Sequence, residues 1–374
     1  MALISRIPGL RQIPQALGSI YDDVVLFDSW RGQYSDNPRA ISEELHRRGE
    51  GLEHVWVLDP SLVSEVPEWV VPVAPGSAEH LAMMGRARHL VSNSTVLGFH
   101  HKRRGTKFMQ TWHGTPLKKI GFDIKRVRSR ASRQAVKTLQ HNVERWDLLL
   151  SPNRFSTPIF REAFDYSGPI AETGYPRNDL LLASDAGDIR ASTRRRLGIG
   201  EEQRAVLYAP TFRDDAGFSL ASEVERMARQ LGRSHTLLLR LHKVDAGQVR
   251  RRTGALFRDL SDYPDNRELY LAADVLVTDY SSVMFDFAVT RKPMLFFTYD
   301  LQQYRDELRG FCFDFEAEAP GPLLSTVDEV VDAIQDIDAV AGSYRGAYER
   351  FADRFCHLDD GRATERVVDA LLGL

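Results

Sequence analysis

The sequence has 374 residues, of which 43% are hydrophobic and 27% are charged, which is enough for two globular domains with separate cores. Its net charge of -3 gives the chain as a whole no electrostatic preference for nucleic acid. A membrane-spanning helix is excluded because no run of about 20 apolar residues occurs, and a signal peptide is not expected because Pro8, Gln12 and Pro14 interrupt the apolar N-terminal stretch.

Short apolar runs rich in β-branched residues alternate with longer helical patterns along the chain. In the first half we expect strands at residues 22–27, 54–59, 89–94, 107–112, 146–151 and 169–174. In the second half we expect strands at residues 204–210, 236–242, 274–279 and 293–297. This alternation predicts an α/β fold with parallel sheets that helices cover on both faces.

A polar stretch without a strand pattern, residues 183–203, separates the two halves. We therefore predict an N-terminal domain of residues 1–185 and a C-terminal domain of residues 186–374. The last helix, in "GRATERVVDALLGL", is expected to take Asp359 or Asp360 as its N-cap. An arrangement in which this helix packs back on the N-terminal domain is left open.

The stretch "MQTWHGTPLKK" places His113 directly after a predicted strand. Gly114 and Pro116 then turn the chain, and two lysines, the first of them Lys118, add positive charge. A histidine with an ordinary pKa of about 6.5 can accept a proton from a hydroxyl at neutral pH, and nearby cations can hold a phosphate. We therefore predict that His113 is a general base beside a phosphate site.

The stretch "DVLVTDYSSVMFDFAV" predicts a second phosphate-binding position. A buried strand ends at Asp279, and Ser281 and Ser282 then open a helix, whose first N–H groups are donors for an anion. Serine hydroxyls can add further donors. The alternative is that Asp279 or Ser281 is an ordinary N-cap.

Two further strands of the second half end in side chains that suit a phosphate. One ends at His242 and Lys243, and the other is followed by Thr211 and Arg213. Ligands of open α/β sheets bind beyond the carboxyl ends of the strands. We therefore expect these strand ends to face one crevice.

Positive charge is concentrated in one stretch. Between Lys102 and Arg145 thirteen Lys and Arg residues accompany only two acids, Asp123 and Glu144. The stretch either forms a solvated helix face or binds anionic phosphates or lipid headgroups. In the second case four apolar residues are expected to add contacts with the membrane: Phe122, Ile124, Val127 and Trp146.

Several other classes of site are not supported. The chain lacks the glycine-rich P-loop and dinucleotide motifs, and it lacks H-E-x-x-H and paired C-x-x-C spacings, so no metal and no permanently bound cofactor are expected. Cys312 and Cys356 stand far apart and are expected to be reduced, structural thiols.

Together the motifs resemble the CDP-glycerol glycerophosphotransferase family, the enzymes of teichoic acid and related capsule synthesis. The resemblance extends over nearly the whole chain and rests on ordered blocks: "SWRGQYSDNPRAISEEL", "SNST", "QTWHGTPLKKIG", "SPNRFSTPIFREAF", "ETGYPRND", "LYAPTFRD", "LRLH", "TDYSSVMFDFA", "RGFCFDF" and "DDGRATERV". It implies a GT-B fold, with two Rossmann-like domains and a cleft between them. It also implies that the C-terminal domain holds most of the nucleotide.

The resemblance implies transfer of glycerol phosphate from CDP-glycerol to a hydroxyl of a lipid-linked saccharide or polymer acceptor, with release of CMP. His113 matches the family's essential histidine and His242 matches a second one, so both are predicted to be catalytic. Lys243 departs from the family pattern, which commonly has proline there. The predicted substrate-binding residues are Gly114, Thr115, Lys118, Thr211, Arg213, Lys243, Thr278, Ser281, Ser282 and Asp286.

The resemblance leaves several alternatives open. The donor can be CDP-ribitol in place of CDP-glycerol, and the enzyme can add one unit or many. Two other interpretations are open. The protein can be a nucleotide-sugar glycosyltransferase of the same fold, or a non-catalytic subunit that binds anionic polymer. We expect a cytoplasmic enzyme, peripheral on the inner face of the membrane, that contacts anionic lipid and no nucleic acid.

Overall fold

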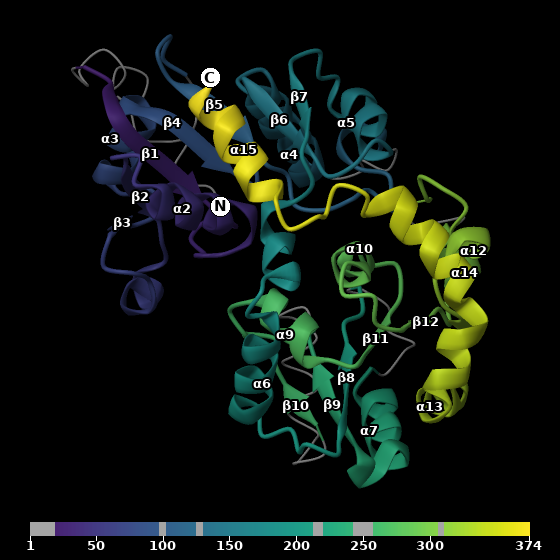
Figure 1. Ribbon diagram of the computed structural model, residues 1–374. Coiled ribbons are helices and arrows are strands. Elements are labelled where there is room, and N and C mark those ends of the chain that lie inside the picture. The colour runs from purple at the N-terminus through teal and green to yellow at the C-terminus, as the bar shows by residue number, and fades with distance from the viewer. Residues whose placement is uncertain (1–18, 97–101, 125–129, 212–219, 242–256, 306–309) are drawn as a thin grey trace. The chain divides into compact units, whose positions relative to one another are not determined.

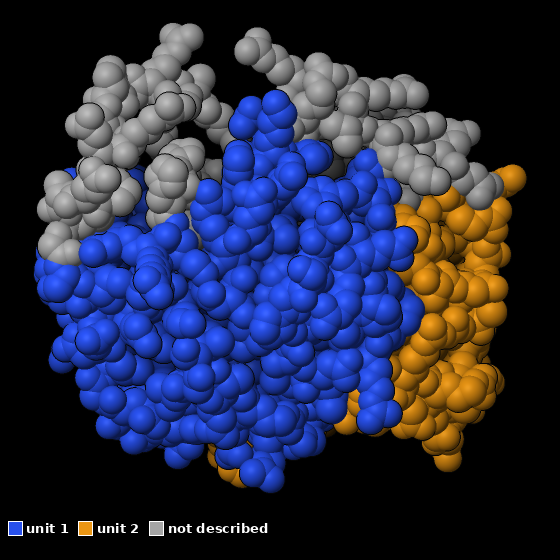
Figure 2. Space-filling model, turned by 90° about the horizontal axis from the view of Figure 1, so that it is seen from above, with its two compact units in different colours: residues 1–113, 120–179, 358–374 blue, residues 114–119, 180–357 orange. Residues whose placement is uncertain are grey.

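Two parallel β-sheets organise the chain, one in each of two units (Figures 1 and 2). The computed structural model describes residues 19–96, 102–124, 130–211, 220–241, 257–305 and 310–374. Unit 1 consists of residues 1–113, 120–179 and 358–374, and unit 2 consists of residues 114–119 and 180–357. The fold class is therefore α/β, as predicted.

The sheet of unit 1 has the order β3-β2-β1-β4-β5-β6-β7, and every neighbouring pair is parallel. Its strands are β1 (Tyr21–Asp28), β2 (Glu53–Val57), β3 (Val70–Val73), β4 (Ala87–Ser92), β5 (Lys107–Gln110), β6 (Leu148–Ser151) and β7 (Ile170–Glu172). The described helices are α2 (Asp36–Arg48), η3 (Pro60–Glu65), α3 (Ala78–Arg86), η4 (Gly121–Asp123), α4 (Arg130–Val143), α5 (Ser156–Phe164), η5 (Pro176–Leu182, which continues into unit 2) and α15 (Ala363–Leu372).

Both faces of this sheet are buried. Successive β1 side chains point to opposite faces, so Leu26 belongs to one core and Phe27 to the other. Ile41 of α2 and Val367 of α15 cover the face that includes Phe27, and Figure 1 shows α15, drawn in yellow, against this sheet. Phe160 of α5 covers the other face. Burial on both faces explains the unbroken apolar strands of the sequence.

The sheet of unit 2 has the order β10-β9-β8-β11-β12-β13, again all parallel. Its strands are β8 (Arg204–Tyr208), β9 (His235–Leu239), β10 (Arg258–Asp259), β11 (Val275–Thr278), β12 (Met294–Phe297) and β13 (Leu323–Leu324). The described helices are α6 (Ala186–Arg196), α7 (Leu220–Leu231), η6 (Gly232–Ser234), α9 (Asn266–Ala272), α10 (Val283–Ala288), α11 (Leu301–Gln303), α12 (Phe315–Glu318), α13 (Val327–Gln335) and α14 (Ile337–Phe355). Helices α7 and α13 share one core with the sheet.

All ten predicted strands are present, and the sequence patterns missed three others. These are β3, β10 and β13, and each lies at an edge of its sheet. Strand β3 contains Pro72. An edge strand tolerates proline because only one of its two sides forms hydrogen bonds with a neighbouring strand. Strands β10 and β13 have only two residues each, too few to give a pattern.

The prediction that Asp359 or Asp360 caps the last helix is wrong. Helix α15 begins at Ala363, and no side chain of its own N-cap residue caps it. Asp179, far away in the sequence, accepts hydrogen bonds from the N–H groups of Ala363 and Thr364 at 3.1 and 2.7 Å and from the Thr364 hydroxyl at 2.6 Å. A remote carboxylate therefore satisfies the helix start and fixes the C-terminal segment to unit 1.

Trp146 is not available for a membrane contact, contrary to expectation. Its side chain is buried in the core of unit 1, where its ring packs against Phe164 at a centroid distance of 5.4 Å. Phe122 is partly buried against the same core. These two apolar residues of the basic stretch therefore pack inside the unit. Val127 lies outside the described residues. Both cysteines are free thiols, as predicted.

Replacing Asp179 by alanine should lower the free energy of unfolding by about 1–3 kcal/mol, because three donors at the start of α15 lose their acceptor. Asp360→Ala is the matched control, since the exposed Asp360 pairs with Arg366 and accepts one backbone hydrogen bond, from the Arg362 N–H at 3.0 Å, so its loss should cost only about 1 kcal/mol. Urea unfolding followed by circular dichroism measures both values. A larger loss for Asp360→Ala than for Asp179→Ala would contradict this account.

Candidate active site

Each sheet has one point at which the strand order reverses. In unit 1 this point lies between β1 and β4, and in unit 2 it lies between β8 and β11. The loops at the carboxyl ends of two such strands run in opposite directions and leave a crevice, which is the usual ligand site of open α/β sheets. In both units, polar residues that follow these strands are joined by hydrogen bonds.

His113 lies just after β5, next to the reversal point of unit 1. Its Nδ1 is 2.7 Å from the carbonyl oxygen of Asn93, the residue that follows β4. Because a carbonyl oxygen only accepts, Nδ1 carries the proton of the neutral ring and Nε2 carries the lone pair. Among the described residues no group forms a hydrogen bond with Nε2. Nε2 is also absent from the fully buried polar atoms that have no hydrogen-bond partner. Nε2 is therefore the ring nitrogen that can accept a proton.

The backbone before His113 is held in an uncommon conformation. Trp112 has a φ of 51°, in the left-handed region. The Trp112 N–H donates to the Gln110 side chain at 2.8 Å, and the Trp112 carbonyl accepts from the Asn37 amide at 3.3 Å. These two bonds turn the chain so that His113 meets Asn93.

Asn93 also binds the loop that follows β1. Its side-chain oxygen accepts from the Trp30 N–H at 3.1 Å, and its amide donates to the Ser29 hydroxyl at 3.0 Å. Asn93 is fully buried. One residue therefore links both strands of the reversal point to the histidine.

Aromatic rings and a buried ion pair surround the imidazole. The ring centroids of Trp30 and Trp112 lie 4.6 and 4.2 Å from that of His113. Asp36 and Arg177 pair at 2.7 Å. Burial lowers the pKa of His113 below its ordinary value of 6.5 and Arg177 also lowers it, whereas the Asn93 carbonyl and Asp36 raise it. The imidazole is therefore neutral at pH 7.

Left-handed backbone is concentrated around this histidine. Of the six described non-glycine residues with positive φ, four belong to this site: Trp30, Arg31, Asp36 and Trp112. Each costs on the order of 1 kcal/mol, and such strain accumulates where a site requires it. Arg177 anchors this site, since it is buried against Asp36.

Asp28, the last residue of β1, is a second titratable group at this reversal point. It is buried, and its Oδ1 has no hydrogen-bond partner among the described residues. Burial raises the pKa of its carboxyl to about 6, although the N–H and the charge of Arg31 lower it. The carboxyl therefore titrates close to neutral pH.

The reversal point of unit 2 has its own bridge. The Thr211 N–H donates to both carboxylate oxygens of Asp279, at 2.9 and 3.0 Å, and the Thr211 hydroxyl donates to Oδ1 at 2.8 Å. Thr278 is fully buried, and its hydroxyl donates to the Ala209 carbonyl at 2.7 Å. Asp279 thus fixes the loop after β8, and Thr278 supports the strand pair.

Residues Gly114–Lys119 belong to unit 2, although His113 belongs to unit 1. A Cβ on Gly114 would lie 3.0 Å from Oγ and 3.2 Å from Cβ of Ser282, so the backbone of Gly114 packs directly on this serine. The Lys118 ammonium donates to the Tyr304 hydroxyl at 3.0 Å and lies 3.5 Å from the Thr211 hydroxyl. The sequence neighbours of His113 therefore lie among the predicted phosphate ligands of unit 2.

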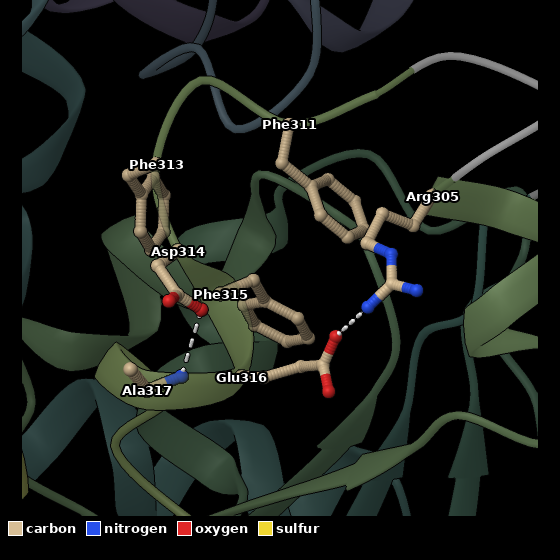
Figure 3. A pocket seen from close by; sticks show the side chains of 7 residues that line it. All are labelled: Arg305, Phe311, Phe313, Asp314, Phe315, Glu316 and Ala317. Atoms are coloured by element: carbon tan, nitrogen blue, oxygen red, sulfur yellow. Dashed lines mark hydrogen bonds and ion pairs between the residues drawn. The ribbon is translucent and has the colours of Figure 1, made fainter.

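The same segment pairs with the rim of a cavity of about 530 Å³ in unit 2. The Cys312 N–H donates to the Leu117 carbonyl at 2.8 Å, and Lys118 forms an antiparallel bridge with Phe311. Figure 3 shows the phenylalanine rings of this cavity beside the ion pair of Arg305 and Glu316. The lining residues are Arg305, Phe311, Phe313, Asp314, Phe315, Glu316 and Ala317.

The structure brings together most of the predicted residues that it describes. Gly114, Lys118, Thr211 and Ser282 lie around the reversal point of unit 2, and Ser281 stands at the start of α10 beside Ser282. Three more are buried in the same unit: Thr115, Thr278 and Asp286. The other three predicted residues lie outside the described residues: His242, Lys243 and Arg213. In the described part of the chain no cluster of His, Cys, Asp or Glu is placed to hold a metal ion.

Sequence reasoning assigned no role to the residues that hold His113. These are Asn93, Trp30, Asp36 and Asn37, and all lie in blocks that follow β1 or β4. The signal that identifies them is their position after the carboxyl ends of two predicted strands, where ligands of open α/β sheets bind.

The family model for CDP-glycerol:poly(glycerophosphate) glycerophosphotransferases matches residues 14–373. The chain is 38% identical to the teichoic acid poly(glycerol phosphate) polymerase of Bacillus subtilis over 93% of its own length and 48% of that protein, so it spans about half of this relative. It is 37% identical to the teichoic acid glycerol-phosphate transferase of Staphylococcus aureus, over 93% of this chain and 92% of that one.

A solved structure of the wall teichoic acid polymerase TagF, a histidine-to-asparagine variant soaked with CDPG, is similar in fold. The TM-score is 0.89 at 32% identity, and the match covers 97% of this chain and 92% of that chain. Both parallel-sheet domains are included, which is the GT-B architecture that the sequence predicts.

Replacing Gly114 by alanine should lower the free energy of unfolding by about 1–3 kcal/mol, because the new methyl group would press against Ser282. Gly187→Ala is the matched control, since Gly187 lies in α6 and a Cβ there meets nothing within 4 Å. The control should be neutral or stabilising. Denaturant titration compares the two, and equal stability would show that Gly114 does not pack closely on Ser282.

Proposed function

The chain belongs to the CDP-glycerol:poly(glycerophosphate) glycerophosphotransferase family, and we propose that it transfers glycerol phosphate from CDP-glycerol to a hydroxyl of a lipid-linked acceptor in teichoic acid-like polymer synthesis. One observation carries the proposal beyond family membership. The Asn93 carbonyl holds His113 in the tautomer that leaves Nε2 able to accept a proton.

In the proposed reaction the acceptor hydroxyl attacks the phosphorus that bears the glycerol. A new P–O bond forms to the acceptor, the bond to the CMP oxygen breaks, and the hydroxyl proton moves to Nε2 of His113. Phosphoryl transfer depends mainly on positioning and charge stabilisation, so the protein needs a base and a set of donors and little covalent chemistry. The lowered pKa of His113 supports the role of base, since the ring is unprotonated at neutral pH.

Unit 2 is the proposed donor side. Lys118, Thr211, Ser281 and Ser282 would hold the diphosphate, and Gly114 allows the backbone to approach it. His242 would stabilise the departing CMP together with Lys243 and Arg213. The hydrogen bonds of Lys118 and Thr211 support this assignment, because they place a cation and a hydroxyl beside the end of β8.

The proposed location is the inner face of the membrane, as a peripheral protein. No described helix has the length and apolar character to cross a bilayer. Two cations of the basic stretch serve the fold: Lys102 pairs with Asp147, and Arg103 donates to the Gly85 carbonyl. Exposed cations such as Arg104 and Lys137 would contact anionic headgroups.

Replacing His113 by alanine should reduce turnover by about 10²–10⁴-fold and leave affinity for CDP-glycerol largely intact, because the base acts only on the acceptor hydroxyl. CMP release with a lipid-linked acceptor measures turnover, and calorimetry measures donor binding. His141→Ala is the control, since His141 is exposed on α4. CDP-ribitol, UDP-sugars and GDP-sugars are tested alongside, and faster reaction with any of them would overturn the assignment of the donor.

The pH dependence follows from the direction of the pKa shift. Because the pKa of His113 is below 6.5, the acid limb of kcat/KM should lie below pH 6.5. Asp36→Asn removes a charge that raises this pKa, so the limb should move to lower pH, whereas Asp28→Asn should leave it in place. An acid limb above pH 6.5, or a shift to higher pH in Asp36→Asn, is the opposite result.

A further inference from the structure

Trp30 is the only aromatic side chain among the large hydrophobic side chains that are exposed in the described part of the chain. Its exposed fraction is 48%. The others are aliphatic residues that stand apart on other elements: Val63, Val71, Leu182 and Leu372. The exposed part of the indole is an apolar surface that a ligand can cover.

The protein fixes this exposed ring in place. Trp30 has a φ of 49°, which is unfavourable for a residue with a side chain. The Trp30 backbone N–H donates to Asn93 at 3.1 Å, and its indole Nε1–H donates to Asp36 at 3.0 Å. Asp36 is in turn held by Arg177 at 2.7 Å. Strain and three polar contacts together keep the ring in one orientation.

The ring is fixed relative to the proposed base. Asn93 binds both residues, Trp30 through its side chain and His113 through its carbonyl. The two ring centroids are 4.6 Å apart and the planes are inclined by 53°. The indole and the imidazole are therefore neighbours in one site of unit 1.

We propose that Trp30 forms the floor of the acceptor subsite and stacks against the C–H face of the polyol or sugar unit that carries the attacking hydroxyl. This inference rests on the proposed function, because it assigns the second substrate of the same site. An indole face binds apolar C–H surface, while hydroxyl groups at the rim of the unit stay free to reach Nε2. Arg31, exposed directly after Trp30, suits an acceptor unit that carries a phosphate.

A second role for Trp30 would be support of the His113 ring alone. The two roles predict different kinetics. A platform for the acceptor changes KM for the acceptor and leaves the donor alone, whereas support of the base changes kcat and the pH profile at saturating acceptor. Trp30→Phe separates them further, because it keeps a stacking face and loses the bond to Asp36.

The experiment uses the full chain, CDP-glycerol, and a synthetic short-chain acceptor that ends in glycerol phosphate. Trp30→Ala should raise KM for this acceptor roughly ten-fold or more, which corresponds to the loss of one stacking contact. KM for CDP-glycerol should stay within about two-fold of wild type, because the donor is held by unit 2 in the proposed function. Trp30→Phe should recover most of the acceptor affinity, and Val63→Ala, an exposed residue of the same unit, should behave as wild type.

An unchanged KM for the acceptor in Trp30→Ala would overturn the proposal. A lower kcat together with a shifted acid limb of the pH profile, at an unchanged KM for the acceptor, would also overturn it. Quenching of indole fluorescence by the acceptor, compared between wild type and Trp30→Phe, tests binding without turnover. A wild-type enzyme that releases no CMP would refute the proposed function, and the fluorescence difference would still decide whether Trp30 binds the acceptor. Absence of that difference would overturn the proposal independently.

Discussion

The hydrogen bond from His113 Nδ1 to the Asn93 carbonyl is the interaction on which the rest of the site depends. It fixes the tautomer and the orientation of the imidazole, and the side chain of Asn93 fixes the loop after β1 at the same time. Asn93 can do this because it follows β4 at the point where the strand order of unit 1 reverses. The topology of the sheet thus brings three distant segments together, and their strained backbone conformations are the cost of that arrangement.

Unit 2 repeats this design with different residues. Asp279, after β11, binds the loop that follows β8, as Asn93 binds the loop that follows β1. The unit boundary falls between His113 and Gly114. Their peptide bond keeps the two Cα atoms about 3.8 Å apart. The proposed base and the segment packed on Ser282 are therefore consecutive in the chain.

The central strands, and with them the strand ends that carry the candidate site residues, could be predicted from sequence, because buried parallel strands are continuous apolar runs and their carboxyl ends share one edge. Edge strands such as β3 could not be predicted, because a strand that pairs on one side only can be short and can contain a proline such as Pro72. The cap of α15 by Asp179 and the bond between Trp30 and Asn93 join residues far apart in the chain, and no local pattern reports them. The left-handed backbone of Trp30 and Trp112 gives no signal in the sequence either, because glycine is the residue expected at a positive φ.

The protonation of the His113 ring is the most direct test of this account. Nitrogen-15 NMR of the imidazole at pH 7.5, with the His113→Gln variant used for assignment, distinguishes the two nitrogens. The account predicts a protonated Nδ1 and an unprotonated Nε2, with Nε2 gaining its proton only below pH 6.5. A ring protonated at Nε2 alone, or at both nitrogens at pH 7.5, would contradict it, because no lone pair would then face the acceptor.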